Sequence, residues 1–97
     1  MKLHFTPRAI ADLEEIAEYL IPLSPPGALK VRHAIIDTLQ NLVDFPRMGR
    51  RQTLDGVRKI GVRKYPYLVY YTVDDGADEI IILTIQHASR ERDFSDA

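Results

Sequence analysis

The chain has 97 residues, of which 45% are hydrophobic and 28% charged, and its formal net charge at pH 7 is -1. This length makes one domain, over residues 1–97, around one hydrophobic core. The absence of cysteine excludes disulfides and thiolate metal sites, and no apolar run approaches the roughly 20 residues of a membrane span. The start, Met-Lys-Leu-His-Phe, is unlike a secretory signal, and the three histidines have no ligand spacing. We expect a cytoplasmic protein with no cofactor, no metal and no membrane association.

The first residues predict a short strand and then a helix. Leu3 and Phe5 alternate with polar residues, which is typical of a strand. Thr6 and Pro7 then start a helix, because the threonine hydroxyl can accept an orphan backbone N–H and proline suits the first helical position. Its predicted apolar face consists of Ile10, Leu13, Ile16, Ala17 and Leu20. An acidic face, either solvated or in contact with a basic segment of a partner, contains Asp12, Glu14, Glu15 and Glu18.

A second helix follows after a short break. The segment from Pro22 to Gly27 ends the first helix and starts the second, with Ser24 as the expected cap. The second helix runs out at Phe45-Pro46. Its apolar stripe consists of Val31, Ile35, Leu39 and Leu42. Two helices with so short a connection lie antiparallel, and they need a second layer to bury both stripes.

The second half of the chain predicts that layer. Three strands are expected, at Val57 to Val62, Tyr67 to Val73 and Glu79 to His87, with a turn at Asp74-Asp75-Gly76. The continuous apolar run Ile80 to Leu83 indicates that the last strand is central. The chain is therefore predicted to have an α+β fold of order β-α-α-β-β-β. In it, an antiparallel two-helix hairpin packs on a three- to four-stranded antiparallel sheet.

Basic residues are concentrated before and along the first of these strands. Seven of the thirteen Lys and Arg residues lie between Arg47 and Lys64, against one acid, Asp55. A cationic edge beside tyrosines can hold RNA, DNA or an acidic partner chain. The net charge of -1 argues against high-affinity nonspecific nucleic-acid binding. The loop cations Arg47, Arg50 and Arg51 are either solvated or paired with carboxylates of a partner.

Strand alternation divides the remaining cations between two faces. Lys59 and Arg63 share one side, with Gly61 between them. Arg58 and Lys64 fall on the other side, which we expect to face the helices near an edge.

Four segments, in the same order, resemble the RelE/ParE superfamily of bacterial toxins: Phe5 to Leu13, Phe45 to Arg50, Pro66 to Tyr71 and Ile85 to Arg90. The sequence Pro-Tyr-Leu-Val-Tyr-Tyr and the closing motif Ile-x-His-x-x-Arg are most similar to the ParE branch. The resemblance implies a RelE/ParE-like fold and a type II toxin–antitoxin toxin, active in growth inhibition and plasmid stabilisation. It also implies a cognate, ParD-like antitoxin in a hetero-oligomer that contacts DNA through the antitoxin. RelE-type members cut messenger RNA on the ribosome, and ParE-type members act on DNA gyrase.

The residues weigh against the ribonuclease activity. In the RelE pattern, cations on the strands and an arginine and a tyrosine in the closing segment serve RNA cleavage, which needs charge stabilisation and proton transfer. Lys59 matches the first lysine of that pattern. Gly61, Tyr67, Ala88 and Phe94 stand where the pattern has the other functional groups. We therefore predict that the chain is a gyrase-binding toxin and not an enzyme.

Two alternatives remain open: a ribosome-dependent messenger RNA endonuclease that uses Lys59, His87 and Arg90, and a degenerate member that binds an antitoxin but poisons nothing. His87 ends an apolar strand, so it either moves protons or hydrogen-bonds a backbone group. Exposure and charge alone suggest which residues bind the target or a partner. They are Arg58, Lys59, Arg63, Lys64, Tyr67, Arg90 and Arg92.

Overall fold

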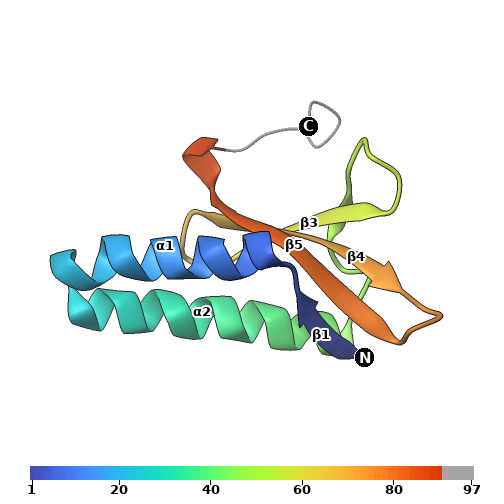
Figure 1. The fold of residues 1–97 in the computed structure, drawn as a ribbon, viewed down its shortest axis with the longest axis horizontal. Helices are drawn as coiled ribbons and strands as arrows, with labels where there is room; N and C mark the ends of the chain where they lie inside the picture. Colours follow the sequence, from blue (N-terminus) through green and yellow to red (C-terminus); the bar gives the residue numbers. More distant parts are fainter. Residues whose placement is uncertain (91–97) are drawn as a thin grey trace.

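Two antiparallel helices pack against one face of a five-stranded sheet in the computed structural model, which describes residues 1–90 (Figure 1). The helices are α1 (Pro7–Leu23) and α2 (Pro25–Asp44). The strands are β1 (Lys2–Phe5), β2 (Arg50–Arg51), β3 (Val57–Gly61), β4 (Tyr67–Asp74) and β5 (Glu79–His87), and a short 3₁₀ turn, η1 (Ala88–Arg90), follows β5. The predicted α+β class and the helix hairpin are confirmed. None of the helices in residues 1–90 is long and apolar enough to cross a membrane.

The sheet differs from the prediction in strand order, in pairing and in the number of strands. Its order is β1-β5-β4-β3-β2, so β4 is the central strand and β5 lies between β4 and β1. Its pairing is mixed, because β1 runs parallel to β5 whereas the other neighbours are antiparallel. The parallel pair arises because α1 and α2 carry the chain across the sheet before the meander begins. The fifth strand, β2, has only two residues, too few to show a sequence period.

Both helix starts follow the predicted caps. The hydroxyl of Thr6 accepts the N–H of Ala9 at 3.1 Å, and the hydroxyl of Ser24 accepts the N–H of Gly27 at 3.1 Å. Each cap satisfies one backbone donor of the first helical turn, which stabilises a helix by about 1 kcal/mol. Pro22 lies inside the last turn of α1, and the chain turns at Ser24 directly into α2.

The core lies between the hairpin and the middle of the sheet. Leu42 of α2, Val69 and Tyr71 of β4, and Ile80 and Ile82 of β5 are fully buried there. Burial of each such side chain contributes roughly 1.5–3 kcal/mol before conformational entropy is subtracted. Ile10 was predicted to belong to this core, but it is 48% exposed. Ala9 lies inward in its place, because the buried face of α1 is rotated away from Ile10.

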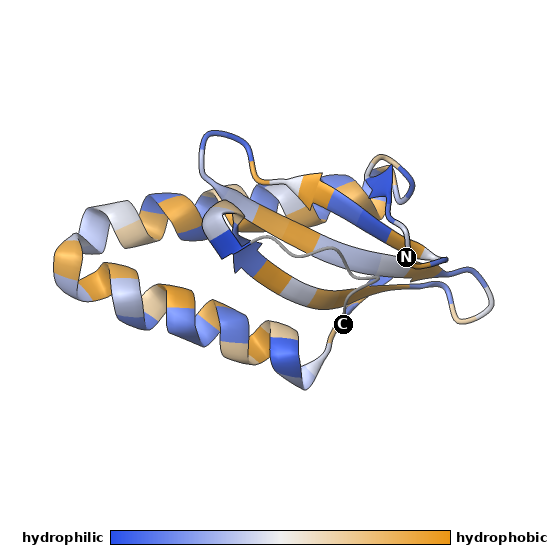
Figure 2. Ribbon diagram, turned by 90° about the horizontal axis from the view of Figure 1, so that it is seen from above, coloured by the Kyte–Doolittle hydropathy of each residue, from blue (hydrophilic) through white to orange (hydrophobic). Residues whose placement is uncertain are grey.

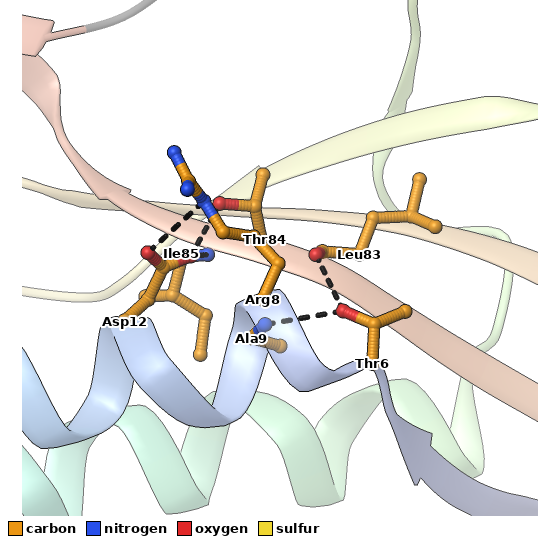
Figure 3. Close-up of polar contacts among 7 residues, drawn as sticks. All are labelled: Thr6, Arg8, Ala9, Asp12, Leu83, Thr84 and Ile85. Carbon is orange, nitrogen blue, oxygen red and sulfur yellow. Dashed lines mark hydrogen bonds and ion pairs between the residues drawn. The ribbon is translucent and has the colours of Figure 1, made fainter.

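Beyond the end of β1, side chains at the start of α1 form hydrogen bonds with the backbone of β5 (Figure 3). The N–H of Thr6 donates to the carbonyl of Ile82 at 3.1 Å, and its hydroxyl donates to the carbonyl of Leu83 at 2.7 Å. One carboxylate oxygen of Asp12 then accepts the N–H of Ile85 at 2.9 Å and the hydroxyl of Thr84. Asp12 is therefore buried, and the expectation that it belongs to an outward acidic face was wrong.

Candidate functional site

The first candidate surface is the basic edge, which we define as Arg50, Arg51, Arg58 and Lys59. It is formed by β2 and β3, which pair so that Arg50 lies opposite Lys59 and Arg51 opposite Arg58. Like charges in directly opposed positions destabilise a sheet. The ion pairs found among residues 1–90 do not include Arg50 or Arg51. This edge therefore brings four cationic side chains together on two adjacent strands.

Arg58 has a structural role within that edge. Its guanidinium donates to the carbonyls of Arg47 and Gly49, at 3.1 and 2.9 Å. Tyr71 holds the same loop, because its hydroxyl donates to the carbonyl of Pro46 at 2.8 Å and accepts the N–H of Gly49 at 2.9 Å. Arg58 thus faces the helix side near an edge, as predicted. Its donors are directed into the fold.

Of the other predicted cations, Lys59 is partly buried, and Arg63, Lys64 and Arg90 are exposed. Arg63 and Lys64 lie in the turn between β3 and β4, where Lys64 adopts a left-handed backbone conformation with φ 74°. Arg90 is exposed at the end of η1. Arg92 and Phe94, which also entered the predictions, lie outside the described residues.

The second candidate surface is the terminal cleft, a depression of about 720 Å³ between α1 and the end of β5. Tyr67 and His87 lie opposite each other at its sheet side, with their rings edge to face and their centroids 5.4 Å apart. Burial, and to a lesser extent the nearby Tyr19, raises the pKa of the Tyr67 phenol. The other polar lining residues are Arg8, Asp12, Glu15, Gln86, Ser89 and Arg90. The sequence did not predict that Tyr19 lines this cleft, because its own position on an exposed helix face does not show which residues lie beside it in the fold.

The imidazole of His87 is fixed by local hydrogen bonds. The backbone N–H of Ser89 donates to Nδ1 at 3.1 Å, and the Ser89 hydroxyl lies 2.8 Å from the same nitrogen. Nδ1 is therefore the acceptor in the neutral ring, and Nε2 carries the proton. A backbone hydrogen bond was one of the two roles expected for this residue. Among residues 1–90, no three His, Asp or Glu side chains come together as metal ligands.

The sheet separates Lys59 from His87, two of the three residues of the alternative catalytic set. His87 is opposite Tyr67, whose ring belongs to the core on the helix side. Ile60 packs on that core, so the preceding Lys59 points to the opposite face. Lys59 on β3 and His87 on β5 are two strands apart, and their partners on β4 are separated by three residues. This geometry puts the Cα atoms of Lys59 and His87 roughly 14 Å apart. In the alternative set of Lys59, His87 and Arg90, Lys59 and His87 therefore do not approach one phosphodiester from the same face.

A third surface is the hairpin groove, an apolar depression of about 690 Å³ along α1 and α2. The hairpin extends past the sheet (Figure 1), and hydrophobic residues recur along both helices there (Figure 2). Three large apolar side chains that line the groove are exposed: Ile21 by 53%, Leu29 by 55% and Ile36 by 37%. A soluble domain rarely leaves such a surface uncovered, so it marks an interaction site.

A two-helix hairpin on a five-stranded mixed sheet, with a basic edge and an uncovered hairpin groove, defines the class of small RelE/ParE-like toxins. Within that class, a sequence model of the ParE toxin of the type II toxin–antitoxin system parDE matches residues 3–92. The chain belongs to this family.

Individual relatives agree with the assignment. Toxin RelE2 of Caulobacter vibrioides is 34% identical over 86 residues, which cover 89% of this chain and 93% of that protein. A chain of the chromosomal ParDE system from P. aeruginosa is 31% identical with a TM-score of 0.76, over 90% of this chain and 95% of that chain. The intact E. coli RelBE toxin–antitoxin complex contains a chain that is 19% identical with a TM-score of 0.65, over 94% of this chain and 98% of that chain. At this identity the likeness to the RelBE chain concerns the fold alone.

Proposed function

We propose that this toxin acts in the cytoplasm by binding and inhibiting DNA gyrase, that it has no catalytic activity of its own, and that a cognate antitoxin neutralises it. The observation that carries the non-enzymatic part is the separation of Lys59 from His87 on opposite faces of the sheet. Cleavage of RNA requires charge stabilisation and proton transfer around a single phosphorus. Residues that cannot reach the same phosphate do not supply both.

The terminal cleft supports the same proposal. Where the ribonuclease pattern has an arginine, this chain has Tyr67, which is 7% exposed and whose ring packs against His87. Tyr67 therefore stabilises the end of the sheet and provides no cation. The preference for gyrase over the ribosome rests on this loss and on the ParE family assignment.

The antitoxin is expected to cover the hairpin groove. Its apolar lining and its position between two antiparallel helices suit the apolar face of an amphipathic helix. The similar ParDE chain from P. aeruginosa comes from a toxin–antitoxin system, which supports a partner of this kind. Contact with DNA in the hetero-oligomer would be made through the antitoxin. Expression of the toxin alone should give aggregation-prone protein, and co-expression with its antitoxin should give a stable complex.

Seven residues were predicted to contact the target. Four of them are exposed or partly exposed, one lies outside the described residues, and two are directed into the fold. Arg58 and Tyr67 are the inward ones, because the first donates to loop carbonyls and the second packs on His87. We propose that contact with gyrase involves Lys59, Arg63, Lys64, Arg90 and Arg92.

A supercoiling assay tests the proposal directly. Purified toxin is added to gyrase and relaxed plasmid, and separately to a translation reaction with a defined messenger RNA. We expect loss of supercoiling, relief of that inhibition by the antitoxin, and an intact messenger RNA. Ribosome-dependent cleavage of the messenger RNA with normal supercoiling would contradict the proposal and favour the endonuclease.

A further inference from the structure

The hairpin groove carries opposite charges on its two sides. Glu14 lines it on the α1 side and Arg32 on the α2 side, and both residues are exposed. The ion pairs found among residues 1–90 include neither of them. A surface with an acid on one side and a base on the other is complementary to a second copy of itself that is related to it by a two-fold axis.

The acid and the base lie at nearly the same height along the hairpin. Ser24 joins α1 to α2, so residues at equal sequence distances before and after Ser24 lie side by side on the two antiparallel helices. The sequence distances from Glu14 to Ser24 and from Ser24 to Arg32 differ by about two residues, which is about 3 Å along a helix axis. Glu14 and Arg32 are therefore matched in height across the groove.

These charges select one of the two symmetric ways to stack a pair of hairpins. A two-fold axis along the groove places α1 of one copy over α2 of the other, and each Glu14 then lies about 3 Å in height from Arg32 of the second copy. A two-fold axis across the groove would instead stack α1 on α1. That arrangement would bring the exposed Glu14, Glu15 and Glu18 of both copies together, which is unfavourable.

The residues that line the groove also alternate in height when α1 of one copy lies over α2 of the other. From α1, at about 4.5, 10.5 and 15 Å from Ser24 along the helix axis, the groove is lined by Ile21, Ala17 and Glu14. From α2, at about 7.5, 12 and 18 Å, it is lined by Leu29, Arg32 and Ile36. Because the two series of heights interleave, Leu29 of one copy would pack between Ile21 and Ala17 of the other.

We propose that a second copy of this chain covers the hairpin groove when no antitoxin is bound, so that two hairpins form a symmetric four-helix dimer. The dimer would cover Ile21, Leu29 and Ile36, which are exposed in the single chain. A contact about 20 Å long and two helices wide buries roughly 800 Å² in total, and interfaces below about 1,200 Å² are weak and transient. An antitoxin helix can therefore displace the second copy. This competition, but not the dimer itself, rests on the antitoxin site proposed above.

Sedimentation of the full chain without antitoxin, from about 1 to about 200 μM, tests the dimer. The sedimentation coefficient should rise with concentration from that of a monomer to that of a dimer. Glu14→Arg and Arg32→Glu should each weaken the dimer at least tenfold, because each change opposes like charges at two symmetric positions. The variant with both changes keeps both pairs with their charges exchanged, so its dimer should be within about threefold of the original. The controls Glu15→Arg and Lys30→Glu make the same charge changes at exposed positions outside the groove and should have little effect.

Three results would overturn the inference: a monomer at the highest concentration, a doubly changed variant that associates no better than the single ones, or stronger association of Glu14→Arg. The last result would indicate that α1 stacks on α1. Circular dichroism of each variant separates a lost dimer from a lost fold. Addition of antitoxin should convert the dimer into the toxin–antitoxin complex. A dimer that passes the charge-exchange test and binds antitoxin without dissociating would support this inference and contradict only the antitoxin site proposed above.

Discussion

The carboxylate of Asp12 on α1 accepts the backbone N–H of Ile85 on β5 at 2.9 Å, across 73 positions of the sequence. Asp12 also accepts the hydroxyl of Thr84, while Arg8 lies one helical turn away with its Nε 3.6 Å from the other carboxylate oxygen. A helix side chain thus replaces the strand that would otherwise pair with this part of β5. The bond fixes the end of β5, and with it the positions of Tyr67 and His87 in the terminal cleft.

Removal of this carboxylate should destabilise the fold. Asp12→Ala leaves a buried N–H and a buried hydroxyl without an acceptor, and hydrogen bonds to charged groups contribute about 1.5–3 kcal/mol each. We expect the free energy of unfolding in urea to fall by roughly 2–4 kcal/mol. Glu15→Ala, an exposed change one turn further along α1, is the control and should stay within about 0.5 kcal/mol. An equally small effect for Asp12→Ala would show that water replaces the carboxylate without loss.

Gly49 should tolerate no larger side chain. A Cβ at this position would lie 2.5 Å from the hydroxyl oxygen of Tyr71 and 3.0 Å from the carbonyl oxygen of Lys59. Gly49→Ala must therefore displace the Tyr71 ring or the β3 backbone, at a cost of about 1–3 kcal/mol in unfolding free energy. Gly61→Ala serves as the control, because the space around Gly61 is open. Equal stability of the two variants would contradict the close packing of Gly49 against Tyr71.

Stability should decline at alkaline pH. Burial raises the pKa of Tyr71 above its ordinary value of 10.0, although the Gly49 hydrogen bond and the Arg58 charge act in the opposite direction. Burial also raises the pKa of Tyr67. The unfolded chain releases these protons at lower pH than the folded chain, so this contribution is fully present below about pH 10 and is lost as pH rises through the folded pKa values.

Urea unfolding between about pH 8 and pH 11 measures this decline. Tyr71→Phe should flatten it, because one of the two titrating groups is removed. Its stability at neutral pH should be lower by about 1–3 kcal/mol, since the N–H of Gly49 loses its acceptor and the carbonyl of Pro46 its donor. The slope above pH 10 and not the absolute stability is therefore the informative quantity. A Tyr71→Phe slope as steep as that of the unmodified chain would contradict the assignment.

The role of His87 separates a binding toxin from a nuclease. We expect His87→Gln to remain largely toxic on induction, because an amide can still accept the Ser89 N–H and no proton transfer is required. If His87 were a general acid or base, the same change would lower messenger RNA cleavage by roughly 10²–10⁴-fold. Toxicity and cleavage in cells that express comparable amounts of folded protein distinguish the two outcomes.

A change in the hairpin groove should weaken antitoxin binding and leave gyrase inhibition unaffected. Leu29→Glu places a charge among the apolar side chains of the groove and should weaken the antitoxin complex by at least tenfold, a loss of about 1.4 kcal/mol. Inhibition of gyrase by the same variant should be unchanged. Ile10→Glu, at an apolar residue of comparable exposure outside the groove, is the control for calorimetric titration. Full antitoxin affinity of Leu29→Glu would exclude the groove as the docking surface.

Local chemistry allowed much of the fold to be predicted. The caps at Thr6 and Ser24, the strand Glu79–His87 and the end of α2 before Phe45 all follow from side chains that act on the nearest backbone groups. Their partners lie three or four residues away, or alternate along one strand. Such patterns are complete within the sequence and require no knowledge of the rest of the chain.

Long-range pairing decided the rest. Asp12 resembles its exposed acidic neighbours in sequence and differs only because Ile85 and Thr84 meet it in the folded chain. The pairing with β4 likewise determined that Lys59 and His87 lie on opposite faces of the sheet. Each side chain points to the same face as the β4 residue with which it is paired. The sequence by itself determined the two helices, the four longer strands and the concentration of charge in residues 47–64, because all of these are local. Only the tertiary structure decided which of those charges share a face, because that depends on the register between strands that are far apart in the chain.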